Sequence, residues 1–214
     1  MDMHKWLYEE GMPSNVGRDI LEPYPYKEIK WMLCLPDYNY TTLYRLTPPR
    51  LAICACCERL VTTTGTCRFA GLQTAKDTRN KNAGIMDTAL RDRMVGYVNE
   101  ADLETIFDPV NFMNAHWCCL EIKVQAKRIV FYDPLNQGPY ENARMEIATH
   151  LLNKYDVVAQ NNPIQFDGYA CGVYVCWMFI RHAYKGLGLD MSATSFPRHR
   201  FELFYYLMSN RLLA

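Results

Sequence analysis

The sequence lacks the features that mark several large classes of protein. No run approaches the roughly 18 apolar residues of a membrane span, and the first residues, MDMHKWLYEEGMPS, lack the apolar stretch of a secretory signal. The composition also excludes collagen-like, coiled-coil and largely disordered chains. We therefore expect an intracellular protein, cytoplasmic or nuclear, with no membrane partner.

Net charge is absent as well. The 214 residues contain 23 Lys and Arg against 23 Asp and Glu. A balanced chain has no electrostatic footprint for a phosphate backbone, so nucleic acid is not an expected partner. Half of the residues are apolar and 13% are aromatic, which is enough to bury a sizeable core. We expect residues 1–214 to form a single domain, and the protein to be a monomer.

The nine cysteines do not form the pattern of a disulfide framework. Their number is odd, and five of them gather in two short segments: Cys54, Cys56, Cys57, Cys118 and Cys119. Neighbouring side chains diverge, so we expect reduced thiols. The C-x-x-C spacing of Cys54 and Cys57, with Cys67 further on, could hold zinc if a fourth ligand came from elsewhere. Buried structural thiols are the favoured interpretation, because free cysteine is among the most buried residue types, and no metal site is predicted.

The N-terminal part of the chain has weak secondary-structure signals. Up to about Pro49 it is rich in Tyr and Pro, which favours irregular or extended structure. The run RLAICACCERLV predicts a buried helix over 50–61. Residues 73–84 are polar and predict a surface loop. The segment ADLETIF, residues 101–107, predicts a short helix or turn.

The C-terminal part has clearer patterns. HWCCLEIK and RIVFYD predict two strands, 116–123 and 128–133, which a polar turn at 125–127 joins as a hairpin. The further predicted elements are a helix at 140–155, a strand at 156–161, a loop at 162–170, a central helix at 171–184 and a last helix near 199–212. These elements predict an α+β domain with a small sheet between helices.

Cys171 opens the central helix, and this position suits a nucleophile. The unsatisfied N–H groups and the dipole at a helix start stabilise a thiolate over a thiol. A thiolate at neutral pH needs a counter-cation, and histidine can both hold that charge and return a proton to a leaving group. Four histidines could do so, and spacing alone does not choose among them: His116, His150, His182 and His199. Structural or surface roles are favoured for His150 and His182.

The order of several residues along the chain points to one family. His116 and Trp117 open one strand of the hairpin, Asp133 ends the other, Gln165 precedes Cys171 by six positions, and Gly172 follows it: the segments are PVNFMNAHWCCLEI, KRIVFYDPL and QFDGYACGVYVCWMF. In these segments the chain resembles the cysteine proteases of ubiquitin-like modifiers, the SUMO-specific and related enzymes that share their core with the adenovirus protease. The resemblance is best over about 105–185 and loose elsewhere, with residues 1–80 poorly matched.

The predicted hairpin can place His116 and Asp133 next to each other. Neighbouring antiparallel strands can bring Asp133 to one imidazole nitrogen of His116, which fixes its tautomer and turns the other nitrogen to Cys171. By the resemblance, Gln165 and the backbone N–H of Cys171 would hold the developing oxyanion, a contribution of about 3 kcal/mol per donor. Gly172 would leave room for substrate backbone, and Trp117 would cover the substrate's C-terminal tail.

The resemblance implies a papain-like α+β cysteine peptidase without metal or organic cofactor. It would cut peptide or isopeptide bonds after the C-terminal glycine of a modifier such as SUMO, NEDD8 or ubiquitin, so its partners would be the modifier or its conjugates. The sequence departs from the family at two places. Ala170 stands where many of these proteases have Asp and gives ACG, as in the adenovirus-type enzymes. Trp31 and Asp87 are at best fragments of the early Trp-Leu-x-Asp segment, which helps to grip the modifier tail. Two alternatives are an acetyltransferase that uses the same three residue types and a catalytically silent modifier-binding module.

Overall fold

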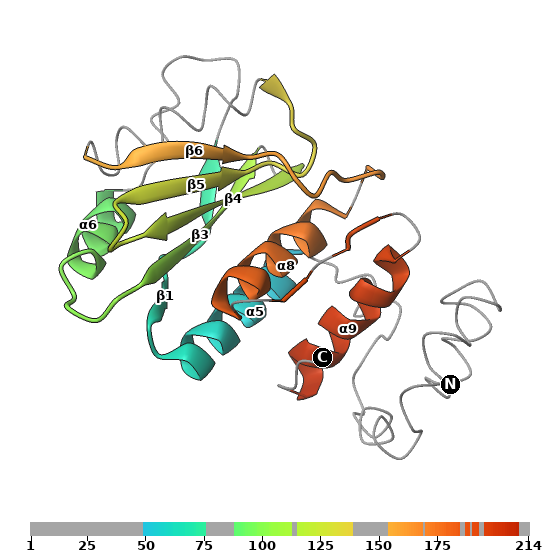
Figure 1. Cartoon of the computed structure of the whole chain (residues 1–214), viewed down its shortest axis with the longest axis horizontal. Helices are drawn as coiled ribbons and strands as arrows, with labels where there is room; N and C mark the ends of the chain where they lie inside the picture. The colour runs from blue at the N-terminus through green and yellow to red at the C-terminus, as the bar shows by residue number, and fades with distance from the viewer. Residues whose placement is uncertain are drawn as a thin grey trace. The chain divides into compact units, whose positions relative to one another are not determined.

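The computed structural model describes eight stretches of the chain, drawn in colour in Figure 1: residues 49–75, 88–112, 115–138, 154–168, 170–184, 187–188, 190–192 and 195–209. Residues 52–189 form one compact unit, and residues 1–51 with 190–214 form another. The predictions for the Tyr- and Pro-rich segment and for Trp31, Asp87 and His150 lie outside the described residues, as does nearly all of the predicted helix at 140–155.

A mixed six-stranded sheet is the centre of the larger unit (Figure 1). The strands are β1 (Cys67–Phe69), β2 (Gln73–Ala75), β3 (Thr105–Phe112), β4 (His116–Lys123), β5 (Arg128–Tyr132) and β6 (Asp156–Gln160). Their order is β1-β3-β4-β5-β6, and β2 pairs with β3 beyond the end of β1. The central pairs β3–β4 and β4–β5 are antiparallel, whereas β1, β2 and β6 run parallel to their neighbours.

The strands with clear sequence patterns are confirmed. The predicted hairpin corresponds to β4 and β5, and the predicted strand at 156–161 to β6, each within one residue. Two predictions are wrong. Residues 105–107 begin the fully buried strand β3 instead of a helix or turn, and residues 73–75 pair with β3 instead of forming a loop.

Strand β3 escaped prediction because it contains Pro109 in its middle. Proline lacks the N–H that a central strand uses, so it argues against a strand in a sequence. The structure shows why it is tolerated here. The β1 pairing stops at Phe107 and the β2 pairing starts at Val110, so Pro109 lies in the gap between them. The missing N–H of Pro109 therefore costs no hydrogen bond to β1 or β2 on that edge of β3.

Two helices pack on one side of the sheet. The predicted helix near 50–61 is α5 (Pro49–Thr64), and the predicted central helix is α8 (Cys171–Ala183), which packs against β4 (Figure 1). The rings of Phe107 and Phe179 lie 4.7 Å apart and join β3 to α8. The Cys56 thiol of α5 is 3.8 Å from the carbonyl oxygen of Cys176 and links the two helices. Ten consecutive residues of α8, 171–180, are buried, as its apolar sequence predicts.

A second apolar cluster lies against α6 (Thr88–Tyr97), a helix that the sequence analysis did not predict. Met94 of α6 is fully buried in this cluster, with side chains from the three central strands, among them Ile106, Leu120 and Ile129. The hairpin that carries His116 and Asp133 therefore has packed residues on both sides. Such packing holds the ends of its strands in fixed positions.

The smaller unit contains α9 (Phe196–Ser209), the helix predicted near 199–212. Its first turns are joined by charged side chains, because Glu202 accepts from Arg198 Nε and pairs with His199 Nδ1, each at 2.8 Å. Across the part of the chain that the structure describes, no helix has both the length and the apolar character needed to cross a membrane.

Candidate active site

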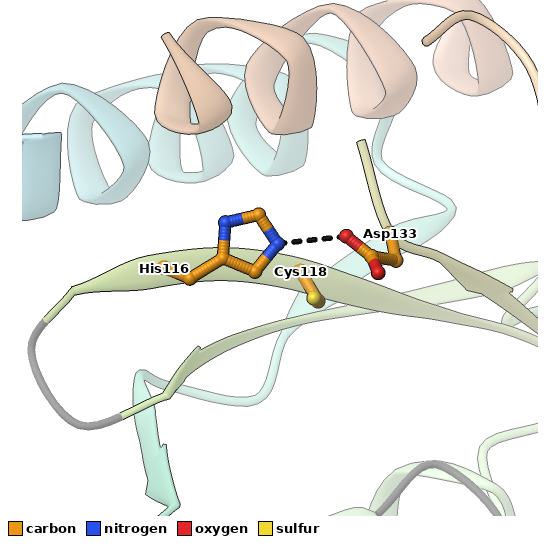
Figure 2. Close-up of side chains that lie close together, drawn as sticks. All are labelled: His116, Cys118 and Asp133. Atoms are coloured by element: carbon orange, nitrogen blue, oxygen red, sulfur yellow. Dashed lines mark hydrogen bonds and ion pairs between the residues drawn. The ribbon is translucent and has the colours of Figure 1, made fainter. Parts of the chain in front are cut away.

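The side chains of His116 and Asp133 form a buried hydrogen-bonded pair at the end of the hairpin. His116 Nε2 lies 2.7 Å from Asp133 Oδ1, and both residues are about 95% buried (Figure 2). The turn after β5 holds the carboxylate, because Oδ1 also accepts from the backbone N–H of Leu135 at 2.9 Å and Oδ2 accepts from that of Gln137 at 2.8 Å. These backbone hydrogen bonds fix the Asp133 carboxylate independently of His116. The second ring nitrogen, His116 Nδ1, lies on the side of the ring away from Asp133 (Figure 2).

The electrostatics of the pair favour an imidazolium beside a carboxylate. Burial opposes protonation of His116, but hydrogen bonds and charge from Asp133 and Cys171 outweigh it and raise the pKa of His116 to about 9. Burial likewise disfavours the Asp133 carboxylate, yet His116 and the backbone N–H groups of Gln137 and Leu135 hold the pKa of Asp133 below its usual value. At neutral pH the ring is therefore charged and can stabilise an anion beside it.

Cys171 is the first residue of α8, as the sequence predicts, and its side chain is close enough to His116 to influence its protonation. Among the described residues, no side chain forms a cap hydrogen bond at this end of the helix, where Ala170 is the N-cap residue. The N–H groups of the first turn are therefore available to an anion that lies beside Cys171. The structure brings together His116, Asp133 and Cys171 from three distant segments.

The other described histidines have partners of their own. His182, near the end of α8, contacts the buried carboxylate of Glu121 in β4 through its Nδ1. His199 pairs with Glu202 in the smaller unit. Sequence spacing left the choice among histidines open, and the structure places His116 beside Cys171.

Gln165 lies in the loop before α8, and its side chain points to a different partner from the one expected. Its backbone N–H donates to the carbonyl oxygen of Pro134 at 2.7 Å, which links the loop to the residue after Asp133. Its side-chain Nε2 donates to Asp167, at 2.5 Å to the backbone oxygen and 3.0 Å to Oδ1. Gln165 Oε1 is buried and has no hydrogen-bond partner among the described residues.

Trp117 and Gly172, the two residues expected to contact substrate, are both buried. Trp117 is the second residue of β4, opposite Asn111 of β3, and 6% of it is exposed. Gly172 is the second residue of α8, directly after Cys171. Both therefore adjoin proposed catalytic residues in the chain.

Cys118, which the sequence identifies only as one of the clustered cysteines, lies in the site. Extending the β4–β5 register by one pair from Cys119 and Tyr132 places Cys118 opposite Asp133. Its sulfur and the nearest ligand atoms of His116 and Asp133 all lie within 4.8 Å of one another (Figure 2). Counting residue pairs outward from the predicted turn could have identified it.

These three side chains are also the one group of potential metal ligands among the residues that the structure describes. Nitrogen, sulfur and oxygen donors of this kind suit zinc, but each must give up its proton to bind. Burial, followed by the charges of Asp133, Cys119 and Cys171, raises the pKa of Cys118 well above its usual value. The His116–Asp133 contact is already a hydrogen bond. The arrangement therefore fits proton handling better than metal binding.

The remaining described thiols, apart from the half-buried Cys54, fit the buried structural interpretation. All eight described cysteines are free. Cys56 and Cys57 are fully buried in α5, and Cys67 is 4% exposed. Cys54, Cys57 and Cys67 do not gather as potential metal ligands in the described structure.

A family model and a curated relative match this chain. Residues 79–212 match the model described as "Ulp1 protease family, C-terminal catalytic domain". Ubiquitin-like-specific protease 1 of Saccharomyces cerevisiae is 32% identical over an 85-residue alignment that covers 35% of this chain and 14% of the yeast protein. The matched region is thus a small part of that relative's length.

Solved structures share the fold. The SUMO protease Ulp1 with its catalytic cysteine oxidised to a sulfonic acid gives a TM-score of 0.54 at 20% identity, over 81% of this chain and 85% of that one. The C-terminal Ulp1 protease domain in complex with Smt3, the yeast ortholog of SUMO, gives 0.53 at 20% identity, over 81% and 82%. These likenesses confirm the predicted α+β papain-like fold.

Proposed function

Because the chain belongs to the Ulp1 protease family of cysteine peptidases, whose catalytic-domain model covers residues 79–212, we propose that it cuts after the C-terminal glycine of a ubiquitin-like modifier. The bond cut is a peptide bond in a precursor or an isopeptide bond in a conjugate. The relative from yeast is a ubiquitin-like-specific protease, and a domain of the same fold is solved with Smt3. Both support a modifier of the SUMO, NEDD8 or ubiquitin kind as the partner.

The observation that carries the proposal is the charge arrangement around His116. Its ring is held by Asp133 at 2.7 Å and its protonated form is favoured by both Asp133 and Cys171. A cysteine peptidase needs this pairing of a thiolate with an imidazolium, since the thiolate is the nucleophile and the imidazolium is the acid. We assign Cys171 as the nucleophile, His116 as the acid and base, and Asp133 as the residue that orients the ring.

The reaction then proceeds in two halves. The Cys171 thiolate adds to the glycine carbonyl carbon, and the oxygen of that carbonyl becomes an oxyanion beside the start of α8. The backbone N–H of Cys171 stabilises this charge, together with the Gln165 amide once one of its N–H groups turns from Asp167 to the oxyanion. His116 gives its proton to the leaving amine, and an acyl-enzyme remains. His116 then takes a proton from water, which attacks the thioester and releases the modifier.

The remaining roles concern the substrate tail and the protein as a whole. Gly172 leaves room for the substrate backbone, and Trp117 covers the C-terminal tail of the modifier. Neither role needs a metal or an organic cofactor. We further propose that residues 1–214 act as one catalytic domain and as a monomer, on modifiers or their conjugates inside the cell and without nucleic acid.

A panel of modifiers with a C-terminal electrophile tests the proposal. Each of SUMO, NEDD8 and ubiquitin carries a vinyl sulfone in place of its last glycine, and intact-protein mass spectrometry reads the adduct. We expect one modifier to attach at Cys171, and no adduct with Cys171→Ala or after unfolding in denaturant. The same modifier with a C-terminal fluorogenic amide should be hydrolysed by the native protein.

Two outcomes would overturn the proposal. A native protein that binds a modifier in a pull-down but never reacts with any probe is a silent binding module. Transfer of labelled acetyl groups from acetyl-CoA to protein, without amide hydrolysis, would identify an acetyltransferase instead. Unchanged hydrolysis by Cys171→Ala would remove the assignment of the nucleophile.

A further inference from the structure

Two apolar side chains flank Gln165 and are exposed to solvent. Phe166 is 70% exposed and Ile164 is 41% exposed, whereas Gln165 between them is 6% exposed. Among the residues that the structure describes, the other exposed large apolar side chains are Val95 and Val158. Single exposed apolar residues are ordinary on a protein surface, but a pair beside a reactive centre is typical of a contact surface.

The loop that leads to Phe166 is fixed to the end of β5. The hydroxyl of Tyr132 donates to the carbonyl oxygen of Pro163 at 2.5 Å. The backbone N–H of Gln165 donates to the carbonyl oxygen of Pro134 at 2.7 Å. Phe166 is therefore presented to solvent by a loop that two hydrogen bonds hold against the sheet, next to the proposed active site.

Ile164 and Phe166 lie on the outer side of this loop. Exposure alternates over residues 164–166, as it does in an extended segment, where side chains at positions i and i+2 share a side. Gln165 thus faces the protein and its two neighbours face solvent. Because consecutive Cα atoms are about 3.8 Å apart, both apolar residues stand at the rim of the site that Gln165 serves.

The chemistry of the cleaved bond decides which part of a substrate reaches this rim. On the modifier side the bond follows a glycine, which has no side chain, and an extended tail adds about 3.3 Å per residue before the folded modifier begins. On the other side of an isopeptide bond is a lysine. Its apolar stem of four methylenes brings the backbone of the acceptor protein within about 6 Å of the bond. An apolar rim therefore suits the acceptor lysine and its neighbours.

We propose that Ile164 and Phe166 form a surface, the acceptor surface, that contacts the acceptor protein of a lysine-linked conjugate. The two side chains pack against the lysine stem and an apolar residue beside that lysine, which removes their apolar area from water. This inference rests on the proposed function of the same site. It adds a substrate class, since conjugates then react faster than modifiers that carry a small C-terminal group.

Two substrates made from one modifier test the acceptor surface, and the modifier is the one that labels Cys171 in the vinyl sulfone panel. In the first, its C-terminal glycine is joined to the lysine Nζ of a short peptide with leucine on each side of the lysine. In the second, it ends in a methylamide, which is the same kind of bond without the stem. In Phe166→Ser we expect kcat/KM to fall about five- to tenfold for the lysine peptide and to stay within about twofold for the methylamide.

Two further variants serve as controls. Phe166→Leu keeps an apolar side chain and should retain most of the native rate on the lysine peptide. Val95→Ser removes an exposed apolar side chain of α6, in the same unit, and should leave both rates native. The vinyl sulfone probe has no acceptor, so it should label Phe166→Ser at the native rate. Slower labelling would show that the loop contacts the modifier instead and would overturn the acceptor surface.

The outcomes separate the acceptor surface from the proposed function. In a native protein that cleaves both substrates, an unchanged rate of Phe166→Ser on the lysine peptide, or an equal fall on both substrates, would disprove the acceptor surface alone. A native protein that cleaves neither substrate would disprove the proposed function, and the acceptor surface with it.

Discussion

Asp133 binds His116 at 2.7 Å, although the sheet register places Asp133 opposite Cys118. The hydrogen bond therefore runs diagonally across the hairpin, from Asp133 to the residue that lies two positions before Cys118 in β4. Side chains on diagonal positions of an antiparallel pair remain within reach of each other when one of them is long. The backbone N–H groups of Leu135 and Gln137 fix the carboxylate at the far end. The ring orientation thus depends on the turn after β5 as well as on the strands.

Replacement of Asp133 should damage catalysis more than folding. In Asp133→Asn the ring loses the carboxylate that orients it and raises its pKa, so we expect kcat/KM to fall by about a hundredfold or more. His116→Ala should abolish hydrolysis. Modifier-amide hydrolysis measures both, with Asp156→Asn as a control that removes one exposed carboxylate of the same unit. Native activity in Asp133→Asn would contradict the proposed role.

The pH dependence should show the raised pKa of His116. Because the imidazolium supplies the proton to the leaving amine, we expect kcat/KM to fall as pH rises through about 9. In Asp133→Asn this descending limb should move to lower pH, since one of the partners that raise the pKa is lost. A native profile that falls near pH 6.5, the usual value for histidine, would show that the ring is not held in its charged form.

The same shift has a consequence for stability. A pKa raised in the folded state stabilises the protein fully below the unfolded-state value, and this contribution is lost as pH rises through about 9. The difference in unfolding free energy between the native protein and His116→Gln should therefore shrink between pH 6.5 and pH 10. Denaturant unfolding at several pH values measures it. A difference that stays constant would contradict the assignment of the charge.

The elements around the site could be predicted because local signals agree there. The hairpin has two short apolar runs, WCCL and IVFY, on either side of a polar turn, and α8 is a long apolar run that starts after a glycine-containing loop. Strand β3 could not be predicted, because its polar residues and Pro109 oppose a strand locally and only pairing with β1, β2 and β4 stabilises it. The sequence of α6 has no apolar pattern strong enough to predict a helix. Met94 is buried only because α6 packs against the sheet.

The sequence predicts the residues of the proposed site but not their contacts. The order of His116, Asp133, Gln165 and Cys171 along the chain identifies them without coordinates. The diagonal contact of Asp133 with His116 and the nearby thiol of Cys118 depend on the register of the β4–β5 hairpin, and the hydrogen bonds of Gln165 with Asp167 depend on the geometry of one loop. The register could have been counted from the predicted turn, but the side-chain directions and the loop geometry could not be read from the residue types.

Chemical labelling should separate Cys171 from Cys118, although both lie close to His116. Burial and the nearby charges keep Cys118 protonated, and it is fully buried. Cys171 lies at a helix start beside an imidazolium, which favours the reactive thiolate. We expect iodoacetamide at pH 7.5 to modify Cys171 first, as read by peptide mass spectrometry. In Cys171→Ser, Cys118 should stay unmodified on the same timescale; equal rates for the two thiols would argue against the assigned nucleophile.

A last prediction concerns the fully buried carboxyl of Asp108 in β3. Burial raises the pKa of Asp108 well above its usual value, so the folded protein holds a proton there that the unfolded chain releases. For a group of this kind the stability contribution is complete below the unfolded-state pKa and declines as pH rises. The amide of Asp108→Asn has no proton to release and should avoid this loss.

Denaturant unfolding of the native protein and Asp108→Asn between pH 5 and pH 8 measures the difference. We expect the variant to gain stability over the native protein as pH rises, by at most about 1.4 kcal/mol per pH unit for a single proton. Asp102→Asn changes an exposed carboxylate in a turn and should follow the native protein at every pH. A constant difference between Asp108→Asn and the native protein would mean that Asp108 is ionised in the folded state.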